Sequence, residues 1–350
     1  MKYLYVLLVF VPIAIVGGLL HWNETLIFTT SALGMIPLAG VLGDATEDLA
    51  VYAGPRAGGL INATLGNAAE LIITIFALRE GLLELVKASI TGSILGNILL
   101  ILGFSLFLGG LRNGIQQFDR RQAGVSATMM TLSVIALGIP TLFGTAAGER
   151  NAGPVEQLSV SVALIMMLLY ILSLVFSFVS DRNEDRPAST HGHHEVRWTL
   201  AVATGILVGS TLFIAWLSEI LVGVVEPVAA SLGVTEFFVG IIIVPLVGNV
   251  AEHLVGVQAA VKNKMDLSLG ISLGSSMQIA LFVAPLLVFV SIALGHPMDL
   301  IFHPFELVSL GFAVLIASLI ALDGESNWLE GAQLLAVYTI IALAFFFLPV

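Results

Sequence analysis

The amino-acid sequence predicts an all-α polytopic membrane protein with about eleven transmembrane helices, one leading helix followed by two inverted repeats of five helices. Composition is the first observation: 58% of the 350 residues are apolar and 11% are charged, with a mean hydropathy of +1.03. Soluble domains are about 45–50% apolar and about 25% charged. The second observation is a series of apolar runs of about 20 residues, the length that crosses a bilayer. The third is an internal repeat.

The apolar runs are separated by charged residues, glycines and prolines, which set the expected helix limits. The first run carries one lysine, Lys2, but it is long for a secretory signal and no clear cleavage site follows, so we expect a retained span. The expected helices lie near residues 3–20, 25–54, 57–78, 83–109, 122–143, 157–180, 198–225, 230–261, 266–294, 304–322 and 331–349.

The lysines and arginines fall unevenly between the two sides of the membrane. Ten lie in loops on the side of the N-terminus, and only Arg79, Lys87 and Arg150 lie on the other side. Because positive loops stay in the cytoplasm, we expect a cytoplasmic N-terminus and, after eleven crossings, a C-terminus outside the cytoplasmic (plasma) membrane.

Shifting the sequence against itself by 182 residues aligns two polar clusters without a gap. Gly66–Glu70 (GNAAE) falls on Gly248–Glu252 (GNVAE), and Gly92–Ser93 falls on Gly274–Ser275. The two copies start from opposite sides of the membrane, which predicts an inverted repeat of the kind found in secondary transporters. The expected division is a leading helix at 1–22, a first repeat at 23–180, a cytoplasmic linker at 181–197 and a second repeat at 198–350.

Each repeat carries one glutamate deep in an apolar run. Glu70 precedes Arg79 by 9 residues and Glu252 precedes Lys262 by 10. At about 1.5 Å per residue, both carboxylates lie roughly 14–15 Å from a membrane surface, near the middle of a core of about 30 Å. Since a carboxylate there is costly and marks function, we expect the pair to hold protons or a cation.

Neutral oxygen ligands accompany the two glutamates at helical spacings. Carboxylates with amide, hydroxyl and backbone oxygens suit Ca²⁺, which takes about 6–8 oxygen ligands. Gly66, Gly248 and Pro245 are candidate helix breaks that would free backbone carbonyls, whereas the alternative interpretation gives the small residues only a role in close helix packing. The expected cation ligands are Glu70, Glu252, Asn67, Asn249, Ser93, Ser275, Gln278 and Asn97.

Other features exclude some functions and suggest lesser roles. The net charge of −11 argues against nucleic-acid binding, and the lack of cysteine excludes cysteine-based cofactor and metal sites. Asp44, Glu47 and Asp48 are interpreted as a vestibule that concentrates cations or as a solvated helix end. His191, His193 and His194 belong to the linker and are expected to be solvated.

At Gly66–Glu70 and Gly248–His253 the chain resembles the calcium/cation antiporter superfamily, in its calcium/proton exchanger branch, over essentially the whole sequence. The resemblance implies that Glu70 and Glu252 alternately bind Ca²⁺ and protons, that the eleven spans divide as one, five and five, and that His253 belongs to the motif. It permits a homotrimer.

We therefore expect an antiporter in the lipid bilayer that exports cytoplasmic Ca²⁺ in exchange for protons, with no cofactor and no enzymatic activity. A sodium- or potassium-coupled exchanger is the alternative, although no further acids are found at mid-depth. The sequence Gly270–Gly274 (GISLG) matches a hydrolase nucleophile pattern around Ser272, but that elbow needs a turn from strand to helix. An intramembrane hydrolase is therefore the less favoured alternative.

Overall fold

The computed structural model describes residues 4–147, 152–180 and 196–348. Most of the expected linker, with His191, His193 and His194, lies outside the described residues. In the first half of the chain the elements are η1 (Leu4–Val9), α1 (Phe10–Leu19), α2 (Glu24–Leu65), α3 (Ala68–Arg79), α4 (Leu83–Leu95), the π-helical η2 (Gly96–Ile101), α5 (Leu102–Asn113), β1 (Gln116–Gln117), α6 (Arg120–Ala147) and α7 (Ala152–Ser180).

The second half is helical in the same way. Its elements are α8 (Leu200–Val222), α9 (Val225–Leu232), α10 (Glu236–Phe238), the π-helical η4 (Val239–Ile243), α11 (Val244–Gly248), α12 (Val250–Val261), α13 (Met265–Gln278), the π-helical η5 (Ile279–Val283), α14 (Ala284–Leu294), α15 (Pro304–Ile320), β2 (Glu325–Ser326) and α16 (Trp328–Phe347). The two short strands pair antiparallel, Gln116 opposite Ser326.

Seven helical segments of the described chain are long and apolar enough to cross a membrane, or eight if the segments 225–232 and 236–248, bent by 109°, form one span. The eleven expected spans are therefore not all recognisable by length. The helices near 3–20 and 304–322 are short, and those near 57–78 and 230–261 are interrupted in the middle. What is established is a helical membrane protein with several apolar spans.

Helix α2 bends sharply at Gly54, between two of the expected spans. Gly54 has φ +80° and ψ 174°, a conformation that favours glycine, and Pro55 follows it without a backbone N–H. The sequence therefore predicts this break correctly, although the chain resumes a helix at once and continues to Leu65.

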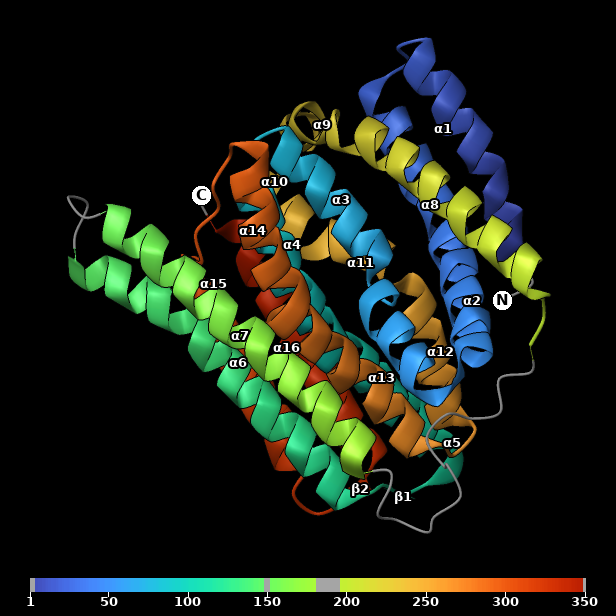
Figure 1. The fold of residues 1–350 in the computed structure, drawn as a ribbon, viewed down its shortest axis with the longest axis vertical. Helices are drawn as coiled ribbons and strands as arrows, with labels where there is room; N and C mark the ends of the chain where they lie inside the picture. Colours follow the sequence, from blue (N-terminus) through green and yellow to red (C-terminus); the bar gives the residue numbers. More distant parts are fainter. Residues whose placement is uncertain (1–3, 148–151, 181–195, 349–350) are drawn as a thin grey trace.

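The helices form three groups (Figure 1). Helices α1, α2 and α8 pack together on one flank, and α6 and α7 lie on the opposite flank. Between them lies the group with α3, α4, α12 and α13. Helix α4 is at the centre of the molecule, since every residue from Leu85 to Leu95 is buried.

Helix limits recur 182 residues apart in this central group. Helix α3 (68–79) corresponds to α12 (250–261), and α4 with η2 (83–101) corresponds to α13 with η5 (265–283). Both copies contain a π-helical segment at the same place, although such segments are rare in proteins.

Candidate functional site

The two polar clusters related by the 182-residue shift, GNAAE and GNVAE, form two helix interruptions at the centre of the fold. The residue with non-helical dihedrals is the asparagine in each copy, Asn67 (φ −100°, ψ 28°) and Asn249 (φ −100°, ψ 4°). Gly66, by contrast, has helical dihedrals, and Gly248 is the last residue of α11. The breaks therefore lie one residue after the glycines that the sequence suggested.

Each asparagine contacts a serine of the other half of the chain. The Ser275 hydroxyl donates to Asn67 Oδ1 at 3.0 Å, and Asn249 Nδ2 donates to Ser93 Oγ at 3.2 Å. These two contacts are equivalent under the 182-residue shift. The paired polar residues of the two halves thus meet at one place, and all four are buried.

Two further amides extend the cluster. Asn67 Nδ2 donates to Gln278 Oε1 at 2.6 Å, and Asn97 Nδ2 donates to Ser275 Oγ at 3.0 Å. Pro245 contributes through its carbonyl oxygen, which accepts from the backbone N–H of Asn249 at 3.0 Å and from its Nδ2 at 3.1 Å.

Glu70 lies in the first turn of α3, against the interruption at Gly248 and Asn249. Its side chain packs on Gly248, where a Cβ atom would come within 3.1 Å of Glu70 Cγ and 3.3 Å of Oε1. Gly248 therefore makes room for the carboxylate. Glu70 is 5% exposed, and Glu252 of α12 is within electrostatic range of it.

Several oxygens of the cluster have no hydrogen-bond partner. They are Glu252 Oε2, Asn249 Oδ1 and Asn97 Oδ1, and His253 Nε2 beside them is also unpaired. Buried polar atoms are normally paired, so unpaired oxygens that gather beside two carboxylates need a cation or a proton to complete them. The set contains the hard oxygen ligands that Ca²⁺ prefers.

Helices α4 and α13, which the 182-residue shift relates, are packed differently near the site. On α13, Cβ atoms at Gly270 and Gly274 would meet nothing within 4 Å, and Gln278 on the same face is half-buried. On α4, the equivalent Ala88 and Gly92 are buried, and a Cβ at Gly92 would lie 1.9 Å from the Ile241 carbonyl oxygen. Helix α4 is therefore packed more tightly at Gly92 than α13 is at the equivalent Gly274.

Asp44 and Asp48 do not face solvent as a vestibule would require. Both are buried, and their carboxylates bond to residues just before α8. Glu47 is the exposed member of the three.

Sequence reasoning assigned two other buried charges, Lys87 and Glu306, to helix ends and loops. Lys87 is buried on α4 and pairs with Glu84 at 2.6 Å and Asp299 at 3.5 Å. Glu306 is 1% exposed. Only the unusual position of Lys87 next to an apolar run could have signalled its burial.

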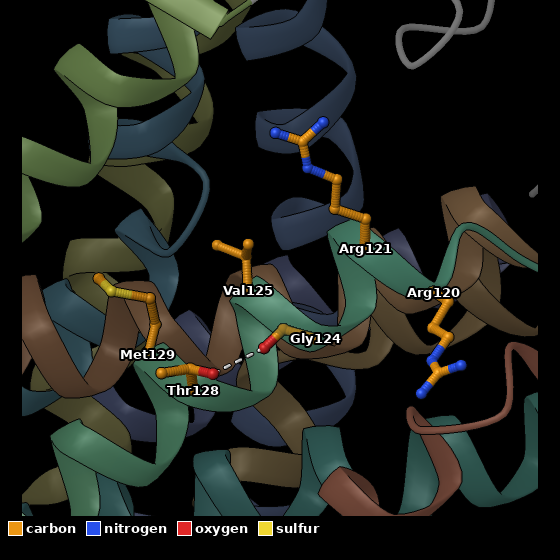
Figure 2. A pocket seen from close by; sticks show the side chains of 6 residues that line it. All are labelled: Arg120, Arg121, Gly124, Val125, Thr128 and Met129. Atoms are coloured by element: carbon orange, nitrogen blue, oxygen red, sulfur yellow. Dashed lines mark hydrogen bonds between the residues drawn. The ribbon is translucent and has the colours of Figure 1, made fainter.

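A hollow of about 710 Å³ lies elsewhere, on the surface of α6 (Figure 2). It is lined by Arg120, Arg121, Gly124, Val125, Thr128 and Met129, and the two arginines extend in opposite directions. The Thr128 hydroxyl donates to the Gly124 carbonyl inside the same helix. With arginines and no carboxylate in its lining, this hollow does not suit a cation.

Ser272 lies inside α13, which is helical from Met265 to Gln278. The strand-to-helix turn that a hydrolase elbow requires is not formed there.

Comparisons with known proteins agree over nearly the whole chain. The profile of the family described as "Sodium/calcium exchanger protein" matches residues 23–179 and 202–347. A Ca(2+)/H(+) antiporter of Synechocystis sp. is 47% identical over 364 residues, covering 99% of this chain and 98% of the relative. The Ca(2+)/H(+) antiporter ChaA of Bacillus subtilis is 45% identical, covering 97% of each chain.

Solved structures are similar as well. The structure of native YfkE superposes with a TM-score of 0.87 at 41% identity, covering 99% of this chain and all of that one. The crystal structure of the H+/Ca2+ exchanger CAX has a TM-score of 0.75 at 16% identity, covers 99% of this chain and 91% of that one, and supports the fold alone.

Proposed function

Because the chain belongs to the sodium/calcium exchanger protein family, with relatives named Ca²⁺/H⁺ antiporters at up to 47% identity, we propose that it exchanges Ca²⁺ for protons and that Glu70 and Glu252 hold both ions in turn. The observation that carries the site assignment is the meeting of two carboxylates and two unpaired amide oxygens, those of Asn249 and Asn97, beside two helix interruptions.

The chemistry of the site couples the two ions. With the site ionised, Glu70, Glu252 and the oxygens of Asn97 and Asn249 supply charge and ligands for Ca²⁺. Without the cation, two carboxylates near each other at the centre of a membrane repel, and protons remove that cost. Since Ca²⁺ and protons need the same oxygens in different states, binding of one displaces the other.

The proposed topology is that of a multi-pass protein of the cytoplasmic (plasma) membrane with eleven spans. A leading helix at 1–22 precedes two inverted repeats, 23–180 and 198–350, which a cytoplasmic linker at 181–197 joins. The helix limits that recur 182 residues apart support the repeat, and the distribution of lysine and arginine supports a cytoplasmic N-terminus.

In this orientation the turn between α12 and α13 lies on the cytoplasmic side of the membrane. Lys262 and Lys264, in the turn between α12 and α13, mark that side. The ionised glutamates would take Ca²⁺ from the cytoplasm, and protons would enter after the access changes to the other side. Export of Ca²⁺ driven by inward proton flow follows.

The proposal is tested by Ca²⁺ uptake into everted membrane vesicles with an imposed pH gradient. Uptake should follow the pH gradient and be insensitive to sodium and potassium. Uptake that ignores the pH gradient and follows sodium would overturn the assignment of the proton as the coupling ion.

The site assignment is tested by Glu70→Gln and Glu252→Gln, which keep the side-chain shape but remove its charge. Each should abolish exchange and the rise in melting temperature that we expect Ca²⁺ binding to cause in detergent. Glu226→Gln, at an exposed position of α9, is the matched control and should leave both unchanged. Exchange at the unmodified rate in either site variant would contradict the assignment.

A further inference from the structure

Asp44 and Asp48 are one helical turn apart on α2, on the same side of the helix. In the structure Asp44 is 6% exposed and Asp48 is 0% exposed. A carboxylate buried to this degree is costly unless it is paired, so its partners indicate its role.

Asp48 bonds to the main chain at the entrance to α8. Its carboxylate accepts from the backbone N–H of Trp198 at 2.9 Å and from that of Arg197 at 3.2 Å. The side chain of Thr199, the N-cap residue of α8, makes no capping hydrogen bond to the first turn of the helix. Both amides precede the N-cap, so Asp48 fixes the segment that leads into α8 and places a negative charge near the helix start, where the helix dipole favours it.

Asp44 binds the side chain of Arg197, which lies in the same segment before α8. The Arg197 guanidinium donates to Asp44 Oδ2, and the Tyr5 hydroxyl donates to the same oxygen at 3.4 Å. One turn after Asp48, the Tyr52 hydroxyl donates to the Trp198 carbonyl oxygen at 3.0 Å. We call Tyr5, Asp44, Asp48, Arg197 and Trp198 the α2–α8 latch.

The latch joins elements that are far apart in the sequence. It connects η1, α2 and the start of α8, and α2 packs along α8 beyond it. Helix α2 ends at Leu65, just before the Asn67 interruption, and α8 also packs against α3, which carries Glu70. A displacement of α2 relative to α8 would therefore disturb the site.

We propose that Asp44 and Asp48 are positioning residues that fasten the start of α8 to α2, so that α2 and α8 move as one body during transport. This inference rests on the proposed exchange function. It differs from the vestibule interpretation, because the charge of Asp44 is matched by Arg197 and the acceptors of Asp48 are occupied by backbone amides.

The first test separates transport rate from Ca²⁺ affinity. Asp48→Asn should lower the maximal rate of Ca²⁺/H⁺ exchange at least ten-fold and leave the KM for Ca²⁺ within two-fold. Asp48→Glu, which keeps the charge, should recover part of the rate. Glu24→Gln, at the exposed start of the same helix, is the control and should change neither quantity.

A vestibule gives the opposite pattern. Asp48→Asn would then raise the KM for Ca²⁺, most strongly at low ionic strength, and leave the maximal rate unchanged. That result would overturn the latch. Loss of exchange in the unmodified protein would instead refute the proposed function, so the two failures are distinguishable.

The second test uses a chain without native cysteine. The double substitution Asp44→Cys and Arg197→Cys removes the ion pair and provides two thiols to be joined by a short bifunctional reagent. Exchange should be low in the reduced protein and should recover when the thiols are joined, since a covalent link replaces the ion pair. Cross-linked protein that exchanges no faster than the reduced form would show that joining these residues is insufficient and would overturn the proposal.

Discussion

Asn67 and Asn249 combine two tasks at the candidate site. Their backbones interrupt the helices, and their side chains contact a serine from the opposite half of the chain. Asparagine suits this position because it tolerates non-helical dihedrals and its amide both donates and accepts. Each interruption is thus held in place by the half of the chain that it faces.

The site is not symmetric in its neutral ligands. Asn97, Gln278 and His253 correspond under the repeat to Ile279, Gly96 and Leu71, none of which has a polar side chain. Ser275 therefore bonds to two amides, Asn67 and Asn97, whereas no equivalent of Asn97 bonds to Ser93.

This asymmetry predicts different effects for two equivalent substitutions. Ser275→Ala leaves Asn67 Oδ1 and Asn97 Nδ2 unpaired in a buried site, at a cost of about 1–3 kcal/mol for each group. Ser93→Ala removes one bond, and Asn249 Nδ2 keeps the Pro245 carbonyl oxygen as acceptor. We expect Ser275→Ala to raise the KM for Ca²⁺ at least ten-fold and Ser93→Ala to raise it by no more than about three-fold.

Vesicle uptake at varied Ca²⁺ concentration measures both values, and melting temperatures in detergent show whether each variant is folded. Equal effects of the two substitutions would mean that the extra bond from Asn97 has no influence on Ca²⁺ binding.

At the level of single residues, Glu70 and Glu252 stand out in the sequence, because a charge within an apolar run is conspicuous. The sequence does not predict the roles of Asp44 and Asp48. Their partners, Arg197 and Trp198, are about 150 residues away, and no local pattern reveals such a pairing.

Helices α4 and α15 each carry a charged residue that the sequence places at a helix end or in a loop but that the structure buries, Lys87 and Glu306. Lys87 lies in the second turn of α4, buried, and bonds to Asp299 in the segment before α15. It is also within electrostatic range of Glu306, whose carboxylate accepts from the His303 backbone N–H at 2.8 Å and completes the cap of α15. The α4 helix and the start of α15 thus share one buried charged cluster.

We predict that Lys87→Met destabilises the protein by about 1–3 kcal/mol, because it leaves Glu306 buried without a nearby positive charge. Adding Glu306→Gln should restore at least half of the loss, since glutamine keeps an acceptor for His303 and carries no charge. Thermal unfolding of the single and double variants in detergent measures the coupling.

Glu84→Gln is the matched control, because Glu84 also pairs with Lys87 but its side chain is 65% exposed. It should change stability by less than about 1 kcal/mol. If the losses from Lys87→Met and Glu306→Gln simply add, the two residues are not coupled.

The order of helices and the break at Gly54 could be predicted from apolar runs, glycine and proline. Which short helices join to form one interrupted span could not be predicted in this way. Helices such as α3 and α12 have only 12 residues each, and only their packing with the rest of the fold shows how the short pieces are arranged. Sequence patterns report local preference, whereas such pieces depend on tertiary contacts.

For the whole molecule, the main feature is that segments related by the 182-residue shift are packed differently. The span Leu83–Asn113 is 72% buried in its most apolar window, and its counterpart Met265–Leu294 is 50% buried. A Cβ atom at Gly92 would lie 1.9 Å from the Ile241 carbonyl oxygen, whereas one at Gly274 would meet nothing within 4 Å. An inverted repeat explains this difference if each half is packed in one state and open in the other.

Alanine at these two glycines should have different effects. In Gly92→Ala, the added methyl would lie 1.9 Å from the Ile241 carbonyl oxygen, so α4 and η4 must separate and the melting temperature should fall markedly. In Gly274→Ala, the methyl has open space, and the described structure should be as stable as the unmodified protein, since alanine favours a helix over glycine by about 1 kcal/mol.

Transport should nevertheless fail in Gly274→Ala, because access can change only if α13 packs as tightly as α4 does here. Under the 182-residue shift, the group that meets position 274 after this change is the carbonyl of Gly59 on α2, the counterpart of Ile241. We expect exchange to fall at least ten-fold with no loss of melting temperature. Gly205→Ala, at another open position on α8, should leave exchange unchanged. A Gly274→Ala variant that transports normally would show that α13 never adopts the packing of α4, and alternating access by exchange of the two halves would then be wrong for this protein.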